Sequence, residues 1–427
     1  MMPRPYLSRD LSQKYLLIAG LYLAQGLPGG LIAYTLPVLM REQGVAQKWI
    51  SLFSLIALPW SIKLLWSRLL DRSPRKAAYI VLSFVLTAAC WLALSVLPIE
   101  RLTDGREMVI ALLLLLLLAN FIMASQDIIT DGLTVRLLTD SERGFANSLQ
   151  VVAYKLGMLI SGGLFLSYYA QIGWQNGMRL LVLVLALGYV PILYHLYAVR
   201  TPQLSAALTP HEVQTSRRAH SLIAVINGFI RSSGVPYWLL LLCAYKLPDG
   251  LISTIVRPFA VDYGIDEAII GRAASYAIIL GGISGIGAGL IWRWQRARFP
   301  LLLLVLAVMQ IAANLGYYAL TRLPDTPQLW WAVSLFEPVV DTMSTVILFA
   351  TMMHYARQDY AGVDYTFQAT LLVVTAGIMH LVGGWMTDAY GHGAVFLSAV
   401  ALSLLTVGLV MKSLQTATAE AVKLKNK

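Results

Sequence analysis

The sequence predicts an all-α membrane protein in which twelve transmembrane helices form two six-helix, pseudo-symmetric bundles. Three observations support this: the composition is apolar, the apolar runs are long and continuous, and the two halves of the chain repeat. Of the 427 residues, 58% are hydrophobic and 13% are charged, whereas soluble domains carry about 25% charged residues. This composition excludes a soluble enzyme, a coiled coil and a disordered chain. Continuous rather than alternating apolar runs exclude a β-barrel.

The apolar runs give the expected spans. A transmembrane helix needs about 20 mostly apolar residues, and runs of this length recur through the whole chain. We expect spans at 15–40, 49–70, 78–98, 108–138, 147–170, 179–198, 236–261, 269–292, 300–320, 329–353, 363–387 and 393–412.

The longest hydrophilic stretch divides the chain near its middle. We therefore expect an N-terminal bundle at 1–198, a linker at 199–235, a C-terminal bundle at 236–412 and a tail at 413–427. The first 14 residues are basic and precede apolar sequence without a small-residue cleavage site, which indicates an uncleaved first span rather than a signal peptide.

The basic residues predict the orientation. Most of the 32 Lys and Arg residues fall in the terminal segments and in the loops after the even-numbered spans. Since cytoplasmic loops carry the Lys/Arg excess, both termini are expected in the cytoplasm. The net charge of +10 then reflects loops facing anionic lipid rather than nucleic acid. Cys90 and Cys243 lie inside apolar runs and indicate neither a disulfide framework nor a metal site.

The two halves share a motif at a constant offset. LPGGLI at 27–32 and LPDGLI at 247–252 are 220 positions apart, and Gly44 and Gly264 keep that offset. Both copies run in the same direction across the membrane. A parallel repeat of six spans resembles the major facilitator architecture.

The loop after the second span resembles the major facilitator loop motif G-x-L-a-D-R-x-G-R-K. Residues 67–76 read SRLLDRSPRK, with both motif glycines replaced, by Ser67 and Pro74. The resemblance implies a cytoplasmic gate, and a plain topogenic basic loop is the alternative. The residues expected at this gate are Asp71, Arg72, Arg75, Asp131, Arg136, Glu142 and Arg143.

Two carboxylate pairs lie in apolar spans at helical spacing. Asp127 and Asp131 are four apart, as are Glu337 and Asp341, so each pair shares one helix face. Acidic residues in a span are costly unless they face a cavity or a partner, and burial with mutual repulsion favours the protonated form. We interpret the pairs, with Asp249, as proton-coupling candidates. The alternative is a salt bridge to Arg136, Arg143 or the 67–76 loop, and for Asp131 the gate is favoured.

Other polar residues at membrane depth are substrate-binding candidates by default. Cations among them would suit an acidic solute, although Asp249, three residues after Lys246, could neutralise that lysine, and His380 could be a packing residue. The candidates are Tyr22, Gln25, Tyr34, Tyr154, Lys155, Lys246, Arg257 and His380.

Longer stretches are similar to the AmpG-like permease family. SQDIITDG at 125–132, ERG at 142–144 and YKLGMLISGG at 154–163 resemble AmpG-type permeases, whose family carries muropeptides and includes acetyl-CoA transporter relatives. LPVLMREQGV at 36–45 and SLIALPWSIKLLW at 54–66 resemble the RhtX/FptX-type siderophore branch. In the C-terminal half, AGVDYTFQATL at 361–371 is the best match.

The resemblance implies a secondary transporter of the bacterial inner membrane rather than an enzyme. We expect import of a polar, anionic solute by alternating access with proton coupling, the solute being a siderophore or its iron complex. The alternative is a muropeptide, and remoter alternatives are a lipid flippase or a membrane-embedded enzyme. The expected partners are this solute, protons and the lipid bilayer, without nucleic acid, metal or cofactor, and the chain is expected to be a monomer.

Overall fold

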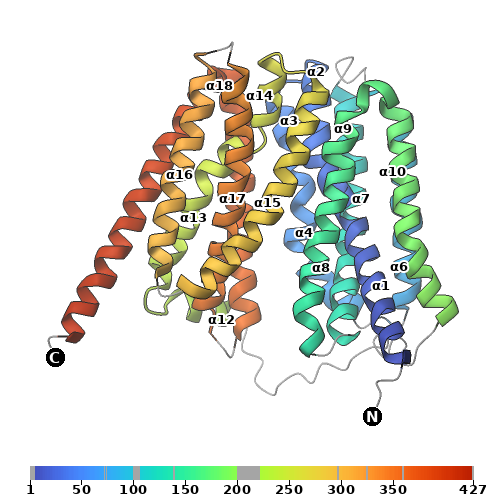
Figure 1. Cartoon of the computed structure of the whole chain (residues 1–427), viewed down its shortest axis with the longest axis horizontal. Helices are drawn as coiled ribbons and strands as arrows, with labels where there is room; N and C mark the ends of the chain where they lie inside the picture. Colours follow the sequence, from blue (N-terminus) through green and yellow to red (C-terminus); the bar gives the residue numbers. More distant parts are fainter. Residues whose placement is uncertain are drawn as a thin grey trace. The chain divides into compact units, whose positions relative to one another are not determined.

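The computed structural model describes residues 5–71, 73, 75–99, 106–137, 140–199, 222–295, 298–323, 326–357 and 360–425. Every regular element in these ranges is helical (Figure 1). Ten helices in the described part of the chain are long and apolar enough to cross a membrane.

Twelve spans were predicted, and two irregularities explain why the described residues contain ten such helices. The predicted span 49–70 is broken into α3 (Gln47–Leu52), the 3₁₀ turn η2 (Phe53–Ala57), α4 (Leu58–Ile62) and α5 (Leu64–Asp71). Pro59 in the first turn of α4 has no backbone N–H, so the helical ladder cannot continue through it. The last two predicted spans are joined in α18 (Ala361–Lys425), which bends at Gly391 with a φ of +79°.

The chain divides into two compact units. Unit 1 takes Met1–Val45, Leu55–Gln214 and Gly264–Ile278. Its long helices are α1 (Pro5–Gly30), α6 (Lys76–Val96), α7 (Arg106–Leu137), α8 (Asp140–Met158) and α10 (Tyr169–Leu193). Shorter elements are η1 (Leu31–Thr35), α2 (Leu36–Glu42), η4 (Leu159–Leu164), α9 (Phe165–Ser167) and η5 (Tyr194–Val199).

Within unit 1, α1 packs along α8 and α10, while α6 packs on α7 and α10. Glycine permits the closest of these contacts, because a Cβ at Gly26 would lie 2.0 Å from the carbonyl oxygen of Tyr154. Large side chains such as Trp91 and Tyr189 are fully buried in the unit.

Unit 2 takes Ala46–Ser54, Thr215–Tyr263 and Ile279–Lys427. Its elements are α3, α12 (Leu222–Ile230), α13 (Val235–Ile252), α14 (Val256–Asp262), the later part of α15 (Glu267–Gln295), α16 (Phe299–Leu320), α17 (Pro327–Tyr355) and α18. α18 packs on α13 and α16, and α16 also packs on α17 (Figure 1). Trp238, Leu242 and Ile347 belong to the buried core of this unit.

Each unit therefore includes a short segment from the other half of the sequence. Residues 46–54 belong to unit 2, and 264–278 belong to unit 1. The start of α3 has no side-chain cap of its own. Instead Asp388 on α18 accepts hydrogen bonds from the backbone N–H groups of Gln47 at 2.9 Å and Lys48 at 3.0 Å. A carboxylate at this position satisfies orphan N–H groups and the positive end of the helix dipole.

The sequence repeat corresponds to a structural repeat. In both halves the helix carrying the LPxGLI motif is followed by a short helix, α2 or α14, and then by a glycine with positive φ. These glycines are Gly44 at +75° and Gly264 at +82°. A second such pair, Gly173 at +70° and Gly391 at +79°, bends α10 and α18.

The segments predicted to lie outside the bundles contain helix where the structure describes them. In the expected linker 199–235, residues 200–221 lie outside the described residues, and 222–230 form α12. The predicted tail after residue 412 continues α18 to Lys425.

Candidate functional site

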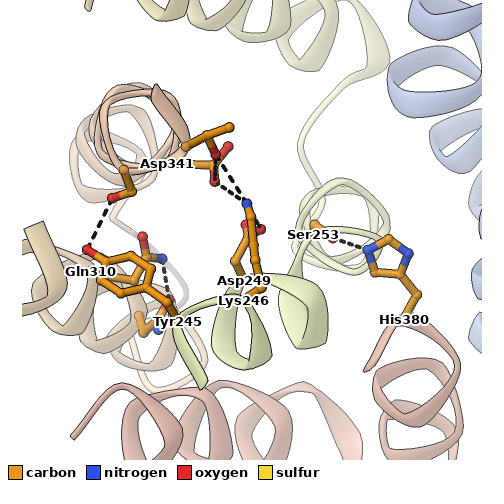
Figure 2. Close-up of polar contacts among 10 residues, drawn as sticks. Tyr245, Lys246, Asp249, Ser253, Gln310, Asp341 and His380 are labelled. Atoms are coloured by element: carbon orange, nitrogen blue, oxygen red, sulfur yellow. Dashed lines mark hydrogen bonds and ion pairs between the residues drawn. The ribbon is translucent and has the colours of Figure 1, made fainter. Parts of the chain in front are cut away.

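Unit 2 contains a charged cluster centred on one lysine, here named the Lys246 cluster: Lys246, Asp249, Asp341 and Thr345. Lys246 Nζ on α13 donates to Asp249 Oδ2 at 2.6 Å, to Asp341 Oδ1 on α17 at 3.0 Å and to Thr345 Oγ1 at 3.3 Å (Figure 2). The side chains of Lys246 and Asp249 are 15% and 17% exposed. One ammonium group therefore uses its three protons on acceptors from two helices.

A proline lies beside the charges on each of these helices. Pro248 lies between Lys246 and Asp249 in α13 and leaves the carbonyl of Ala244 without its usual helical donor. Thr406 on α18 supplies a donor to that carbonyl at 2.9 Å. Pro338 has the equivalent effect in α17. Both helices therefore lack one backbone hydrogen bond where they carry ionisable residues.

The cluster has more carboxyl groups than its lysine can balance. Glu337 is half-buried one turn before Asp341, and the charges of Asp341, Asp249, Arg257 and Lys246 all act on it. With Arg257 included, two cations face three carboxyl groups. The carboxyl groups therefore outnumber the cations around Glu337 by one.

A second polar contact lies at the end of α13. His380 Nε2 on α18 lies 2.8 Å from Ser253 Oγ, and Arg257 donates to the backbone carbonyl of Ser253 at 3.0 Å. Figure 2 shows the Ser253–His380 contact beside Asp249 and Lys246. Ser253 therefore brings two of the predicted binding residues, Arg257 and His380, to one turn of the chain.

Unit 1 contains a comparable cluster, here named the Lys63 cluster: Lys63, Asp127, Asp131 and Tyr22. Lys63 Nζ forms an ion pair with Asp127 Oδ2 and lies 3.7 Å from Asp131 Oδ2, both on α7. The hydroxyl of Tyr22 on α1 donates to Asp131 Oδ1 at 2.6 Å. Asp127 is 7% exposed and Asp131 is 51% exposed, so Lys63 compensates chiefly the buried charge of Asp127.

Two tryptophans anchor the broken helix that carries Lys63. Trp60 Nε1 donates to Asn120 Oδ1 at 3.2 Å, and Trp66 Nε1 donates to Ser125 Oγ at 3.0 Å, both acceptors being on α7. Lys63 also lies over the Trp60 ring, 5.6 Å from its centroid. The break between α4 and α5 falls at Lys63 itself.

Sequence reasoning did not select Lys63, Thr345 or Asp388. Lys63 could have been found, because it is an isolated cation in an apolar run, which is by default a functional candidate. The expected salt-bridge partners of Asp127 were Arg136, Arg143 and the 67–76 loop. Among the described residues Asp127 pairs with Lys63, because the Trp60 and Trp66 contacts hold α4 and α5 against α7.

The remaining predicted binding residues of unit 1 surround α1. Gln25 is buried, and its side chain lies near Asp127. The hydroxyl of Tyr154 would lie 2.8 Å from a Cβ at Gly29, so Tyr154 packs directly on α1. Tyr34 and Lys155 are half-buried on η1 and α8.

The predicted gate falls mostly outside the described part of the molecule. Arg72 lies outside the described residues, as do the side chains of Asp71, Arg136, Glu142 and Arg143. Arg75 is exposed immediately before α6. Asp131 lies with Lys63 and Tyr22 of the Lys63 cluster. The described residues hold no group of three or more His, Cys, Asp or Glu side chains that could bind a metal ion.

Ten helices of membrane-spanning length in the described part of the chain, with charged residues buried in them, indicate a multi-pass membrane protein. The Major Facilitator Superfamily profile matches residues 18–371, and the chain belongs to this family of secondary transporters. The expected fold class and the resemblance to AmpG-like permeases are confirmed.

Three relatives illustrate the similarity. The anhydromuropeptide permease of Escherichia coli K12 is 27% identical over 94% of this chain and 79% of its own length. An uncharacterized protein of Haemophilus influenzae is 24% identical over 91% of this chain and 92% of its own. The putative transporter AmpG 1 of Rickettsia conorii is 20% identical over 88% and 92%.

A solved structure shows the same fold. The crystal structure of a bacterial homologue of the iron transporter ferroportin, in the inward-facing state, matches with a TM-score of 0.67 and 15% identity over 95% of this chain and 98% of that one.

Proposed function

We propose that the chain is an importer of the bacterial inner membrane that carries anhydromuropeptides, or closely related muropeptides, from periplasm to cytoplasm with proton coupling. The observation that carries this proposal is the 27% identity to an anhydromuropeptide permease over 94% of the chain. It favours the muropeptide alternative over the siderophore expected from the sequence.

The Lys246 cluster supports the coupling part of the proposal. Lys246 forms an ion pair between α13 and α17 only while Asp341 is ionised. Protonation of Asp341 would remove this ion pair and leave Lys246 paired with Asp249 on its own helix, with Thr345 as its remaining acceptor on α17. A proton on Asp341 would therefore weaken the polar link between α13 and α17.

The Lys63 cluster has a similar arrangement in unit 1. Lys63 pairs with the buried Asp127, the coupling candidate of this unit, while the half-exposed Asp131 accepts from Tyr22. A solute carboxylate would compete with these aspartates for a lysine. Loading of an anionic solute together with protons would keep the buried charge balanced.

The orientation of the importer can be tested by cysteine labelling. Positions 74 and 215 are both expected on the cytoplasmic side, so single cysteines there should react only when a membrane-impermeant maleimide reaches the cytoplasmic face. Labelling of the two positions from opposite faces would contradict the arrangement.

Uptake tests the substrate. A strain lacking its own anhydromuropeptide permease would express this chain, and right-side-out vesicles would receive radiolabelled anhydromuropeptide with an imposed pH gradient, acidic outside. We expect accumulation that an uncoupler abolishes.

A labelled ferric siderophore and its iron-free form are offered in parallel, and vesicles with an Asp341→Asn variant serve as the coupling control. Siderophore uptake without anhydromuropeptide uptake would overturn the proposed substrate. Anhydromuropeptide uptake that persists undiminished with the uncoupler would overturn proton coupling alone.

A further inference from the structure

Unit 1 has a groove that the proposed transport function does not use. It lies between η4, α9 and the start of α10 on one side and the first turns of α15 on the other, and it has a volume of about 410 Å³. Small-molecule sites span about 300–1,000 Å³. The lining residues are Leu164, Ser167, Tyr168, Gln171, Ala268, Arg272, Ser275 and Tyr276.

Small residues let the two sides of the groove approach each other closely. A Cβ at Gly163 would lie 2.2 Å from Ser275 Oγ, and one at Gly271 would lie 2.3 Å from the backbone nitrogen of Ser167. The two helical segments therefore cross with their backbones in contact. No larger side chain fits at the crossing, and the longer lining residues on either side form the walls of the groove.

The walls are built at helical spacing. Leu164 and Tyr168 are four residues apart on one side, and Arg272 and Tyr276 are four apart on the other. Leu164, Tyr168 and Tyr276 are 41%, 56% and 51% exposed. These side chains remain accessible to a ligand although they belong to membrane-spanning sequence.

Arg272 supplies the charge of the groove. Its Nε donates to the carbonyl of Ala268 at 3.3 Å, which leaves the two terminal nitrogens of the guanidinium for another acceptor. None of the carboxylates that the structure describes forms an ion pair with it. An arginine fork of this kind matches the geometry of a phosphate group.

The surroundings distinguish a lipid phosphate from a free anion. Tyrosines at the ends of spans are typical of the membrane–water interface, where an apolar ring lies beside acyl chains and its hydroxyl beside headgroups. In the orientation predicted from the basic residues, the end of the fifth span and the start of the eighth lie at the periplasmic leaflet.

We propose that this groove binds an anionic phospholipid whose phosphate contacts Arg272 and whose headgroup lies near Gln171. The part of the acyl chain next to the headgroup would pack against Leu164, Tyr168 and Tyr276. The site would hold a structural lipid on the outer surface of unit 1. It is independent of the solute that the transporter carries.

Lipid binding to the purified full chain tests the site. Delipidated protein in detergent would be titrated with phosphatidylglycerol and with phosphatidylethanolamine, and bound lipid would be counted by native mass spectrometry. We expect tighter binding of phosphatidylglycerol, weakened about fivefold by Arg272→Gln, the effect of one basic residue at a lipid surface. Arg272→Lys should retain most of the preference, which separates loss of charge from disturbed packing.

Arg322→Gln is the matched control. Arg322 is exposed and follows the ninth predicted span, so the predicted orientation puts it on the same side of the membrane. It lies over the ring of Tyr318 and lines no part of this groove. The proposal is overturned if Arg272→Gln binds phosphatidylglycerol like the parent, or if Arg322→Gln weakens binding equally. Competition between anhydromuropeptide and phosphatidylglycerol would overturn it in favour of a solute site.

Discussion

Lys246 Nζ lies 3.0 Å from Asp341 Oδ1, and this contact joins α13 to α17 across 95 positions of sequence. Their side chains are 15% and 35% exposed, so the pair is neither fully buried nor a surface pair. The same lysine holds Asp249 at 2.6 Å. Removing Lys246 therefore affects two carboxylates at once.

A double-mutant cycle should measure this coupling. Lys246→Met removes the cation that pairs with Asp249 and Asp341, so the two carboxylates repel each other. In the double variant, Asp341→Asn removes one of these charges and relieves part of the repulsion. We expect a coupling energy of roughly 1–3 kcal/mol, between the values for exposed and for buried pairs. Thermal unfolding in detergent of the parent, the two single variants and the double variant measures this coupling energy. Additive changes in melting temperature would show that Lys246 and Asp341 do not interact.

Carboxamide substitutions should separate binding from coupling. Glu337→Gln and Asp341→Asn remove the proton sites of α17 but keep side-chain size. We expect solute exchange down its own gradient to continue and accumulation driven by a pH gradient to be lost, because the carrier can no longer take up the proton.

The measurement is uptake into vesicles together with a pH-sensitive dye in the lumen. Glu107→Gln, an exposed change in the first turn of α7, serves as the control and should transport normally. If both α17 variants still accumulate solute and acidify the lumen, coupling lies elsewhere, with Asp127 and Asp249 as the next positions to test.

Removing Lys63 should destabilise unit 1 through Asp127. The carboxylate of Asp127 is 7% exposed and has Lys63 as its ion-pair partner. Stranding a buried charge costs about 3–5 kcal/mol, so Lys63→Met should lower the melting temperature clearly. A second change, Asp127→Asn, should restore much of the loss. Lys48→Met alters the same net charge at an exposed position and should have little effect. A Lys63→Met protein as stable as the parent would show that Asp127 is not ionised.

Asp388→Ala should loosen the start of α3. The substitution removes the acceptor of two backbone N–H groups, at Gln47 and Lys48, and a helix cap contributes about 1 kcal/mol. In a background with Cys90 and Cys243 replaced, a cysteine at position 46 should then react about fivefold faster with a maleimide. Asp388→Asn keeps one acceptor oxygen and should give an intermediate rate. Equal rates in all three proteins would show that the cap does not hold the segment.

Much of the fold could be predicted because hydropathy reports membrane burial directly. The spans that are regular helices follow from runs of about 20 apolar residues. The break of the second span was not predicted, although Pro59 inside an apolar run was a signal. The continuous α18 was also missed, because a single glycine at position 391 can turn a chain without any polar loop.

Only the local part of the candidate site could be predicted from the sequence. The spacing of Lys246 and Asp249, or of Glu337 and Asp341, is local and visible in the sequence. The partner of Asp127 is 64 positions away, and its choice depends on how α4 and α5 pack on α7. Such tertiary contacts leave no periodic pattern in a single sequence.

The cap of α3 has a consequence for biosynthesis. Gln47 and Asp388 are 341 positions apart, and translation adds about 5–20 residues per second. The acceptor of the Gln47 N–H therefore emerges roughly 20–70 seconds after Gln47 itself. During that interval the nascent chain must insert most of its spans while the start of α3 lacks its native acceptor. Premature termination anywhere before codon 388 would release a product whose second span begins with an unsatisfied helix end, a feature that proteolytic quality control of the membrane could recognise.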